Sequence, residues 1–158
     1  MTRGIPMPAK LLSTIASIVG LTCGLQTHAM AAVVISGDYY EQQSNIYCQS
    51  VTPCRLELTP IPAGKILDVQ NVNCVIRTDK PAIYFSMGAA SASGGSSARS
   101  LYFPMPSYYF GSNHYHYAVN EAVNYRVGAS PYIYFSTSHE SAANNSVTCT
   151  VTGKLSPR

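Results

Sequence analysis

Residues 62–77 read PAGKILDVQNVNCVIR, a turn followed by one long extended segment. Its apolar residues share one face of a strand up to Val69 and the opposite face from Val72 onward. Because side chains alternate along a strand with a period of two, this change of phase requires one extra residue. We therefore predict a β-bulge or a bend near Gln70-Asn71, after which Cys74 points into the core.

The segment 146–155, SVTCTVTGKL, is the natural counterpart, because its alternation places Cys149 on a buried face. Four cysteines follow residue 31, and an even number in a small exported domain predicts two disulfides with three possible connectivities. We favour a local bridge from Cys48 to Cys54 and a long bridge from Cys74 to Cys149. A zinc site is disfavoured, since these spacings lack paired C-x2-4-C motifs.

Residues 1–31 have the features of a secretory signal peptide. Arg3 and Lys10 precede an apolar run over 11–25, and Ala29-x-Ala31 supplies a cleavage site. A transmembrane anchor is disfavoured because the run is shorter than the roughly 20 residues that a span needs. A lipoprotein signal at Cys23 is disfavoured because the preceding residues fit that pattern poorly. We expect cleavage after Ala31 and export to the periplasm or the medium.

The remaining residues, 32–158, are enough for one domain with a real core and predict no membrane span in the mature chain. Without Arg3 and Lys10, eight basic residues stand against seven acidic ones. This small excess gives no basic field for nucleic acid or for an anionic membrane surface. We therefore expect no nucleic-acid partner. For an exported protein, the expected partner is a cell-envelope protein or a glycan.

Short alternating runs separated by turn residues predict an all-β fold. A disulfide-linked antiparallel β-sandwich, jelly-roll or immunoglobulin-like, fits about eight strands best, and a barrel is the alternative. The absence of tryptophan argues against a true immunoglobulin domain. We expect a first strand or flexible arm at 32–36, and further strands at 54–58, 67–77, 82–87, 100–103, 114–119, 122–127, 131–137 and 146–155. We expect polar or mobile connections at 38–45, 88–97 and 138–145.

Two clusters suggest binding chemistry. His114 and His116 share one face of a predicted strand, a spacing that can ligate a metal, but two ligands alone make an incomplete site. We therefore predict no metal there. Tyrosine offers an apolar ring with a polar tip, which suits sugar stacking or a protein interface. The candidate binding residues are Tyr108, Tyr109, Tyr115 and Tyr117.

Catalytic motifs are missing from the sequence. No Gly-x-Ser-x-Gly elbow, phosphate loop or dinucleotide fingerprint occurs, and each acidic residue stands singly in a strand or turn. The cysteines are explained more simply as disulfides than as nucleophiles. We therefore predict a non-enzymatic protein without a cofactor.

PAGK at 62–65 followed by NVNC at 71–74, together with the closing CTVTGKL at 149–155, resembles small exported bacterial β-sandwich proteins of unassigned function. The resemblance covers two strands and one turn. It implies a bacterial exported sandwich and brings no catalytic or binding residues. The sequence thus predicts an exported structural or interaction module, with a carbohydrate-binding module using a tyrosine-rich face as the alternative.

Overall fold

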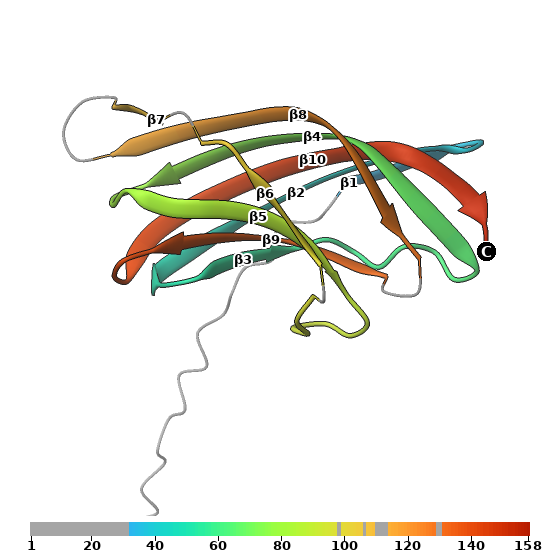
Figure 1. Ribbon diagram of the computed structural model, residues 1–158, viewed down its shortest axis with the longest axis horizontal. Helices are drawn as coiled ribbons and strands as arrows, with labels where there is room; N and C mark the ends of the chain where they lie inside the picture. The colour runs from blue at the N-terminus through green and yellow to red at the C-terminus, as the bar shows by residue number, and fades with distance from the viewer. Residues whose placement is uncertain (1–31, 98, 106, 110–113, 129–130) are drawn as a thin grey trace, which may run out of the picture.

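The computed structural model describes residues 32–97, 99–105, 107–109, 114–128 and 131–158, and these form two antiparallel sheets without a helix (Figure 1). The six-stranded sheet has the order β1 (Ala32–Ser36), β2 (Tyr39–Val51), β10 (Ala143–Pro157), β4 (Lys65–Thr78), β8 (Tyr115–Val127) and β7 (Ser107–Tyr109). The four-stranded sheet has the order β3 (Cys54–Glu57), β9 (Tyr132–His139), β5 (Ala82–Ala90) and β6 (Ser100–Phe103). The predicted all-β sandwich is therefore confirmed.

The strand order selects the jelly roll. Without the flanking β1 and β7, the larger sheet runs β2-β10-β4-β8 and the smaller runs β3-β9-β5-β6. If these eight strands are counted one to eight, the two sheets read 1-8-3-6 and 2-7-4-5, which is the jelly-roll order. An immunoglobulin sandwich instead keeps its first two strands side by side in one sheet. Here β2 and β3 lie in different sheets.

Alternation along the strands fills the core between the sheets. In the smaller sheet, the ring of Phe85 stacks on that of Phe135 with centroids 5.6 Å apart and an interplanar angle of 8°. Phe103 packs against the other side of Phe85. In the larger sheet, the inward-facing residues on either side of the predicted phase change, Leu67 and Ile76 among them, are fully buried. Outward-facing residues of both sheets are more polar.

The predicted bulge at Gln70 is confirmed. On β10, Thr152 pairs with Asn71 and the next residue, Gly153, pairs with Val69, so Gln70 is the extra residue. A side chain at position 153 would meet the β4 backbone, because an added Cβ would lie 2.3 Å from the carbonyl oxygen of Asp68. Glycine is thus required where β10 approaches the bulge closely.

Both predicted disulfide pairings are confirmed. Cys74 and Cys149 are directly opposite each other on neighbouring strands of one sheet, with Cα atoms 4.2 Å apart. This bridge therefore lies within a sheet and does not cross the core. The Cys48–Cys54 bridge links β2 to β3 and is the one that joins the two sheets. Two disulfides are typical of proteins that fold in an oxidising compartment.

The prediction of a polar connection at 38–45 is wrong, because all but the first of these residues lie in the 13-residue strand β2. The inward-facing residues there are Tyr40, Gln42 and Ser44, all buried. The hydroxyl of Tyr40 donates to Oε1 of Gln42, and burial raises the pKa of Tyr40 to about 12. Because the inward-facing residues are polar, the sequence shows no hydrophobic alternation here, and the strand was not predicted.

Two other boundaries also differ from the prediction. The expected break at Asn120-Glu121 lies inside the continuous strand β8, where these residues pair with Asn73 and Val72 of β4. The expected loop over 138–145 is shorter, because β9 runs to His139 and β10 begins at Ala143. In both places pairing with a neighbouring strand overrides the local turn signal. The first segment, 32–36, is a strand.

The predicted signal peptide, residues 1–31, lies outside the described residues. Across the described ranges, no helix is long and apolar enough to cross a membrane.

Candidate functional site

The outer face of the four-stranded sheet carries an exposed group of aromatic and hydroxyl side chains. On β5, β6 and β9, the inward positions hold Phe85, Phe103 and Phe135. The intervening residues therefore point away from the core. We define the tyrosine–serine face as Tyr84, Ser86, Tyr102, Ser136 and Ser138.

Strand register brings these side chains together. Ser86 of β5 pairs with Ser136 of β9 on one side and with Tyr102 of β6 on the other. Tyr84 pairs with Ser138 one row further along. Residues that pair directly across antiparallel strands share a face, with Cβ atoms about 5 Å apart. The five residues thus form one continuous patch over three strands.

Tyr84 and Tyr102 form an edge-to-face pair, with ring centroids 5.6 Å apart and an interplanar angle of 78°. Tyr102 is 64% exposed and Tyr84 is 39% exposed. Edge-to-face contact holds each ring in a defined orientation. The pair therefore presents fixed aromatic surface to the solvent.

The serine hydroxyls beside this pair are available for hydrogen bonding. Within the described part of the chain, no side-chain hydrogen bond is formed by Ser86, Ser136 or Ser138. Ser86 is only 5% exposed, and Ser136 and Ser138 are half-buried. Polar groups that are partly or fully buried usually have a hydrogen-bond partner, so these hydroxyls favour a ligand that supplies one. The face thus combines apolar rings with polar groups that can donate and accept.

Next to this patch, a layered contact fixes the serine-rich connection to the sheet. The Tyr134 ring lies over Gly88, where an added Cβ would come within 2.7 Å of the ring. The Arg55 guanidinium covers the other side of the ring, 3.6 Å from its centroid. The Tyr134 hydroxyl accepts from the backbone N–H of Ser97, and Glu57 accepts from the backbone N–H of Gly94. The connection expected to be mobile is therefore anchored at two described points.

The tyrosines predicted from sequence lie elsewhere. Tyr108 and Tyr109 belong to β7, and their side chains lie outside the described residues. Tyr115 is half-buried. Tyr117 is 3% exposed, and its hydroxyl accepts from the backbone N–H of Ala82. The expectation that Tyr117 lines an exposed face is corrected, because this residue helps to join β8 to β5 in the core.

The exposed tyrosine pair was not predicted from the sequence. Tyr84 and Tyr102 are single tyrosines in ordinary alternating strands, whereas the predicted tyrosines stood in clusters. Only the pairing of β5 with β6 brings the two rings together. Their outward positions in alternation with phenylalanine were the available signal.

His114 and His116, the candidate metal ligands, lie at the start of β8. His116 pairs with Arg77 of β4 and with Tyr108 of β7, and both His114 and His116 make interactions of their own. Among the residues that the structure describes, no group of three or more histidine, cysteine, aspartate or glutamate side chains could hold a metal ion.

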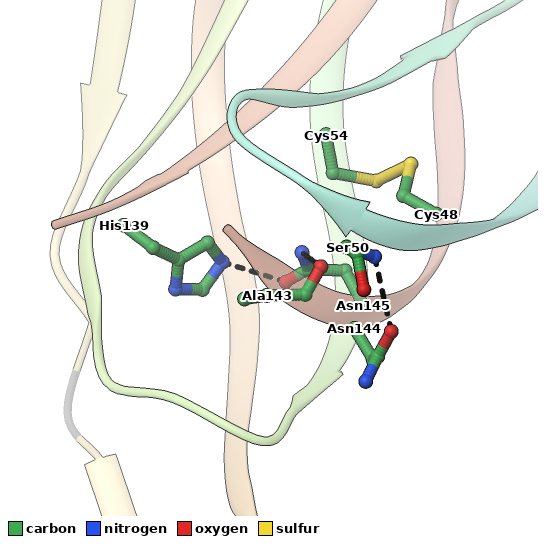
Figure 2. The surroundings of a disulfide bond; sticks show 7 residues. All are labelled: Cys48, Ser50, Cys54, His139, Ala143, Asn144 and Asn145. Atoms are coloured by element: carbon green, nitrogen blue, oxygen red, sulfur yellow. Dashed lines mark hydrogen bonds between the residues drawn. A yellow bond between two sulfur atoms is a disulfide. The ribbon is translucent and has the colours of Figure 1, made fainter. Parts of the chain in front are cut away.

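A second polar cluster lies at one end of the sandwich, beside the Cys48–Cys54 bridge (Figure 2). His139 is 4% exposed, and its Nε2 lies 2.6 Å from Oδ1 of Asn145, which is fully buried. Its Nδ1 lies 3.0 Å from the carbonyl oxygen of Pro81. Hydrogen bonds between Thr52 Oγ1 and the His139 backbone add a third turn, so the cluster joins three turns at this end of the sandwich.

Asp79 extends this cluster to the surface. Its two carboxylate oxygens accept from the backbone N–H and the side-chain amide of Asn144, at 2.9 and 2.7 Å. Asn144 Oδ1 in turn accepts from the backbone N–H of Ser50 at 3.0 Å (Figure 2). Burial alone opposes the charge on Asp79, but the hydrogen bonds from Asn144, with the nearby Lys80, outweigh it and lower the pKa of the carboxyl.

The substitution Asp79→Asn is expected to lower the free energy of unfolding at pH 7 by about 1 kcal/mol, the usual value of a lost hydrogen bond. Because the folded-state pKa of Asp79 is lowered, its contribution is present above the unfolded value of 3.8 and is lost as pH falls below it. Urea unfolding at pH 7 and at about pH 2 should therefore show a smaller pH dependence for the variant.

The matched control is Asp38→Asn. Asp38 is 68% exposed and lies 3.6 Å from Lys154, so this ion pair is expected to contribute a few tenths of a kcal/mol at most. Equal losses for Asp38→Asn and Asp79→Asn would contradict the role assigned to the Asn144 contacts.

Fold and site together define a class: a disulfide-linked jelly roll with an aromatic and hydroxyl face on its smaller sheet. No protein-family model, no curated protein and no solved structure matches the chain. The class therefore rests on the strand order and the side chains described above.

Proposed function

We propose that this protein is an exported, non-enzymatic interaction module that engages its partner through the tyrosine–serine face. The observation that carries the proposal is the exposed Tyr84–Tyr102 pair beside serine hydroxyls that have no partner in the described chain. Aromatic side chains are enriched at the centres of recognition surfaces. The two disulfides support a location in the periplasm or outside the cell, in line with the expected signal peptide.

The packed strands beneath the tyrosine–serine face make it a preorganised surface. Its strands are paired on a packed phenylalanine layer, and the Arg55–Tyr134 contact anchors the adjacent connection. A surface whose side chains are already ordered loses less conformational entropy when it binds. A resemblance to exported bacterial sandwich proteins agrees with this role, and the jelly-roll architecture occurs in capsid and lectin domains as well as in cupins.

Site-specific photo-crosslinking in cells that export the protein tests the proposal. A photoreactive residue in place of Tyr102 is expected to yield a discrete adduct with an envelope component. The matched control is the same replacement at Tyr47, which is equally exposed at 64% but lies on the other sheet. Adducts of equal yield at both positions, or none at Tyr102, would overturn the proposal. A hydrolytic activity abolished by replacing one serine or acid would overturn its non-enzymatic part.

Carbohydrate recognition is the second candidate, and the composition of the face favours it. Sugar rings present apolar C–H surfaces that stack on aromatic rings, and their hydroxyls both donate and accept, as serine hydroxyls do. Tyr84 and the half-buried Ser138 are neighbours in register, so one ring and one hydroxyl are available to the same sugar unit. The central part of this face is also uncharged, which suits a neutral glycan.

Binding to a glycan array, followed by titration calorimetry, tests this candidate. Tyr102→Ala is expected to reduce affinity roughly tenfold, the effect of losing one aromatic contact. Tyr47→Ala should leave affinity unchanged. Binding that responds equally to both substitutions, or an array without any hit, would exclude carbohydrate as the ligand and leave a protein partner for the crosslinking experiment to identify.

A further inference from the structure

The outer edge of the six-stranded sheet is an exposed apolar strand. All five residues of β1, AVVIS, are exposed, and Val33, Val34 and Ile35 retain 41%, 51% and 49% of their surface. Among the described residues, β1 pairs with β2 on one side only, so its other side is an open edge (Figure 1). An open edge leaves backbone N–H and C=O groups available for another strand.

The hairpin geometry identifies which groups face the open edge. A two-residue turn, with Gly37 at a φ of 62°, closes the hairpin at the pair Ser36 and Tyr39. In such a hairpin the closing pair exchanges hydrogen bonds, and hydrogen-bonded pairs then alternate along the ladder. Val34 therefore bonds to β2, whereas Val33 and Ile35 direct their backbone groups outward.

β1 lacks the features by which proteins protect sheet edges. Two other edges whose side chains are described are each four residues long. β3 carries Arg55 and Glu57, and β6 is followed at once by Pro104. Short length, charge and proline all discourage pairing with another strand. β1 has no charge, no proline and no irregularity of register with β2.

We propose that β1 pairs antiparallel with β1 of a second copy of this chain, about a two-fold axis through Val34. This axis sets Val34 opposite Val34 of the second copy, and Val33 opposite Ile35. Val33, Val34 and Ile35 thus each gain an apolar neighbour, and the outward backbone groups of Val33 and Ile35 bond to each other. An isologous contact requires this kind of self-complementarity. The two six-stranded sheets become one.

Charge favours the same arrangement. The two-fold axis also sets Ala32 opposite Ser36 of the second copy, next to the turn that holds Asp38. Cleavage after Ala31, as the sequence predicts, would bring the α-ammonium group of Ala32 near that carboxylate, which also pairs with Lys154 of its own chain. Each dimer would contain this contact twice. The proposal concerns an edge remote in sequence and sheet from the tyrosine–serine face, so it stands independently of the proposed function.

Single cysteines placed along β1 test both the contact and its register. The native cysteines at 48, 54, 74 and 149 are paired, so an introduced thiol is the only free one among the described residues. Cα atoms opposite each other at a pair without hydrogen bonds lie about 4.5 Å apart, which a disulfide can span. Val34→Cys is therefore expected to form a covalent dimer under mild oxidation.

Val33→Cys and Ile35→Cys are the matched controls. Each lies roughly 8 Å from its own copy across the axis, too far for a disulfide. Neither is expected to link by itself, whereas an equimolar mixture of the two should link. The unmodified protein, treated in parallel, accounts for any thiol in residues 1–31.

Sedimentation over a range of concentrations measures the uncrosslinked contact. The native protein is expected to shift from monomer to dimer as concentration rises. Val34→Lys and Val34→Glu should each stay monomeric, because like charges then face each other, and their mixture should dimerise. A native protein that stays monomeric at every concentration, or linkage equal at positions 33, 34 and 35, would overturn the proposal.

Discussion

Replacing Cys74 and Cys149 together by alanine is expected to lower the free energy of unfolding by about 4 kcal/mol. The bridge spans 75 residues of sequence, and closing a loop of that length greatly reduces the entropy of the unfolded chain. The native sheet should survive the change, because β4 and β10 remain paired along their whole length. Urea unfolding gives the loss, and far-UV circular dichroism checks the fold.

The Cys48–Cys54 bridge provides the comparison within the same molecule. It spans only 6 residues, so its removal is expected to cost about 2 kcal/mol on the same entropic grounds. Equal losses for the two double variants would contradict the dependence on loop length. They would indicate that joining the two sheets through β2 and β3 compensates for the shorter loop.

Gly153→Ala is expected to destabilise the protein by ~3 kcal/mol or more, because the added methyl group has no space. Its Cβ would lie 2.3 Å from the carbonyl oxygen of Asp68 and 3.0 Å from Cα of Val69. Both are backbone atoms of β4, so no side-chain rotation relieves the contact. The bulge at Gln70 or the adjoining pairs must shift. Thermal unfolding and urea unfolding both measure the loss.

Gly128→Ala is the matched control, because an added Cβ there meets nothing within 4 Å. We expect it to change stability by less than about 0.5 kcal/mol, as is usual for a surface substitution. If Gly153→Ala and Gly128→Ala lowered the free energy of unfolding equally, the result would contradict the close approach of β10 to the bulge.

The disulfides and the bulge could be predicted because they depend on local pattern. The alternation of apolar residues changes phase between Val69 and Val72, and this change can be seen in the sequence. A regular strand alternates with a period of two, so the change requires an extra residue. Gly153 was not used in that prediction, although an isolated glycine in a strand often marks a bulge or a close approach. The sequence pattern alone did not say which strand lies opposite.

The candidate site was less predictable, because it depends on which strands become neighbours. The Tyr84–Tyr102 pair exists only through the register of β5 with β6. Strand β2 was missed because Gln42 and Ser44 face the core, where apolar residues were expected. The His139–Asn145 contact was hidden in a predicted loop, since its hydrogen bond forms only when β9 and β10 are both in place.

The sequence by itself determined the all-β class, the presence of two disulfides and the bend near Gln70, and it favoured the pairing that the structure confirms. The class, the number of disulfides and the bend follow from side-chain alternation or cysteine count, which act along the chain. Only the tertiary structure decided that the Cys74–Cys149 bridge lies within one sheet and that the Cys48–Cys54 bridge joins the two. The physical reason is that alternation specifies which way a side chain points, whereas the jelly-roll order specifies which strand it meets.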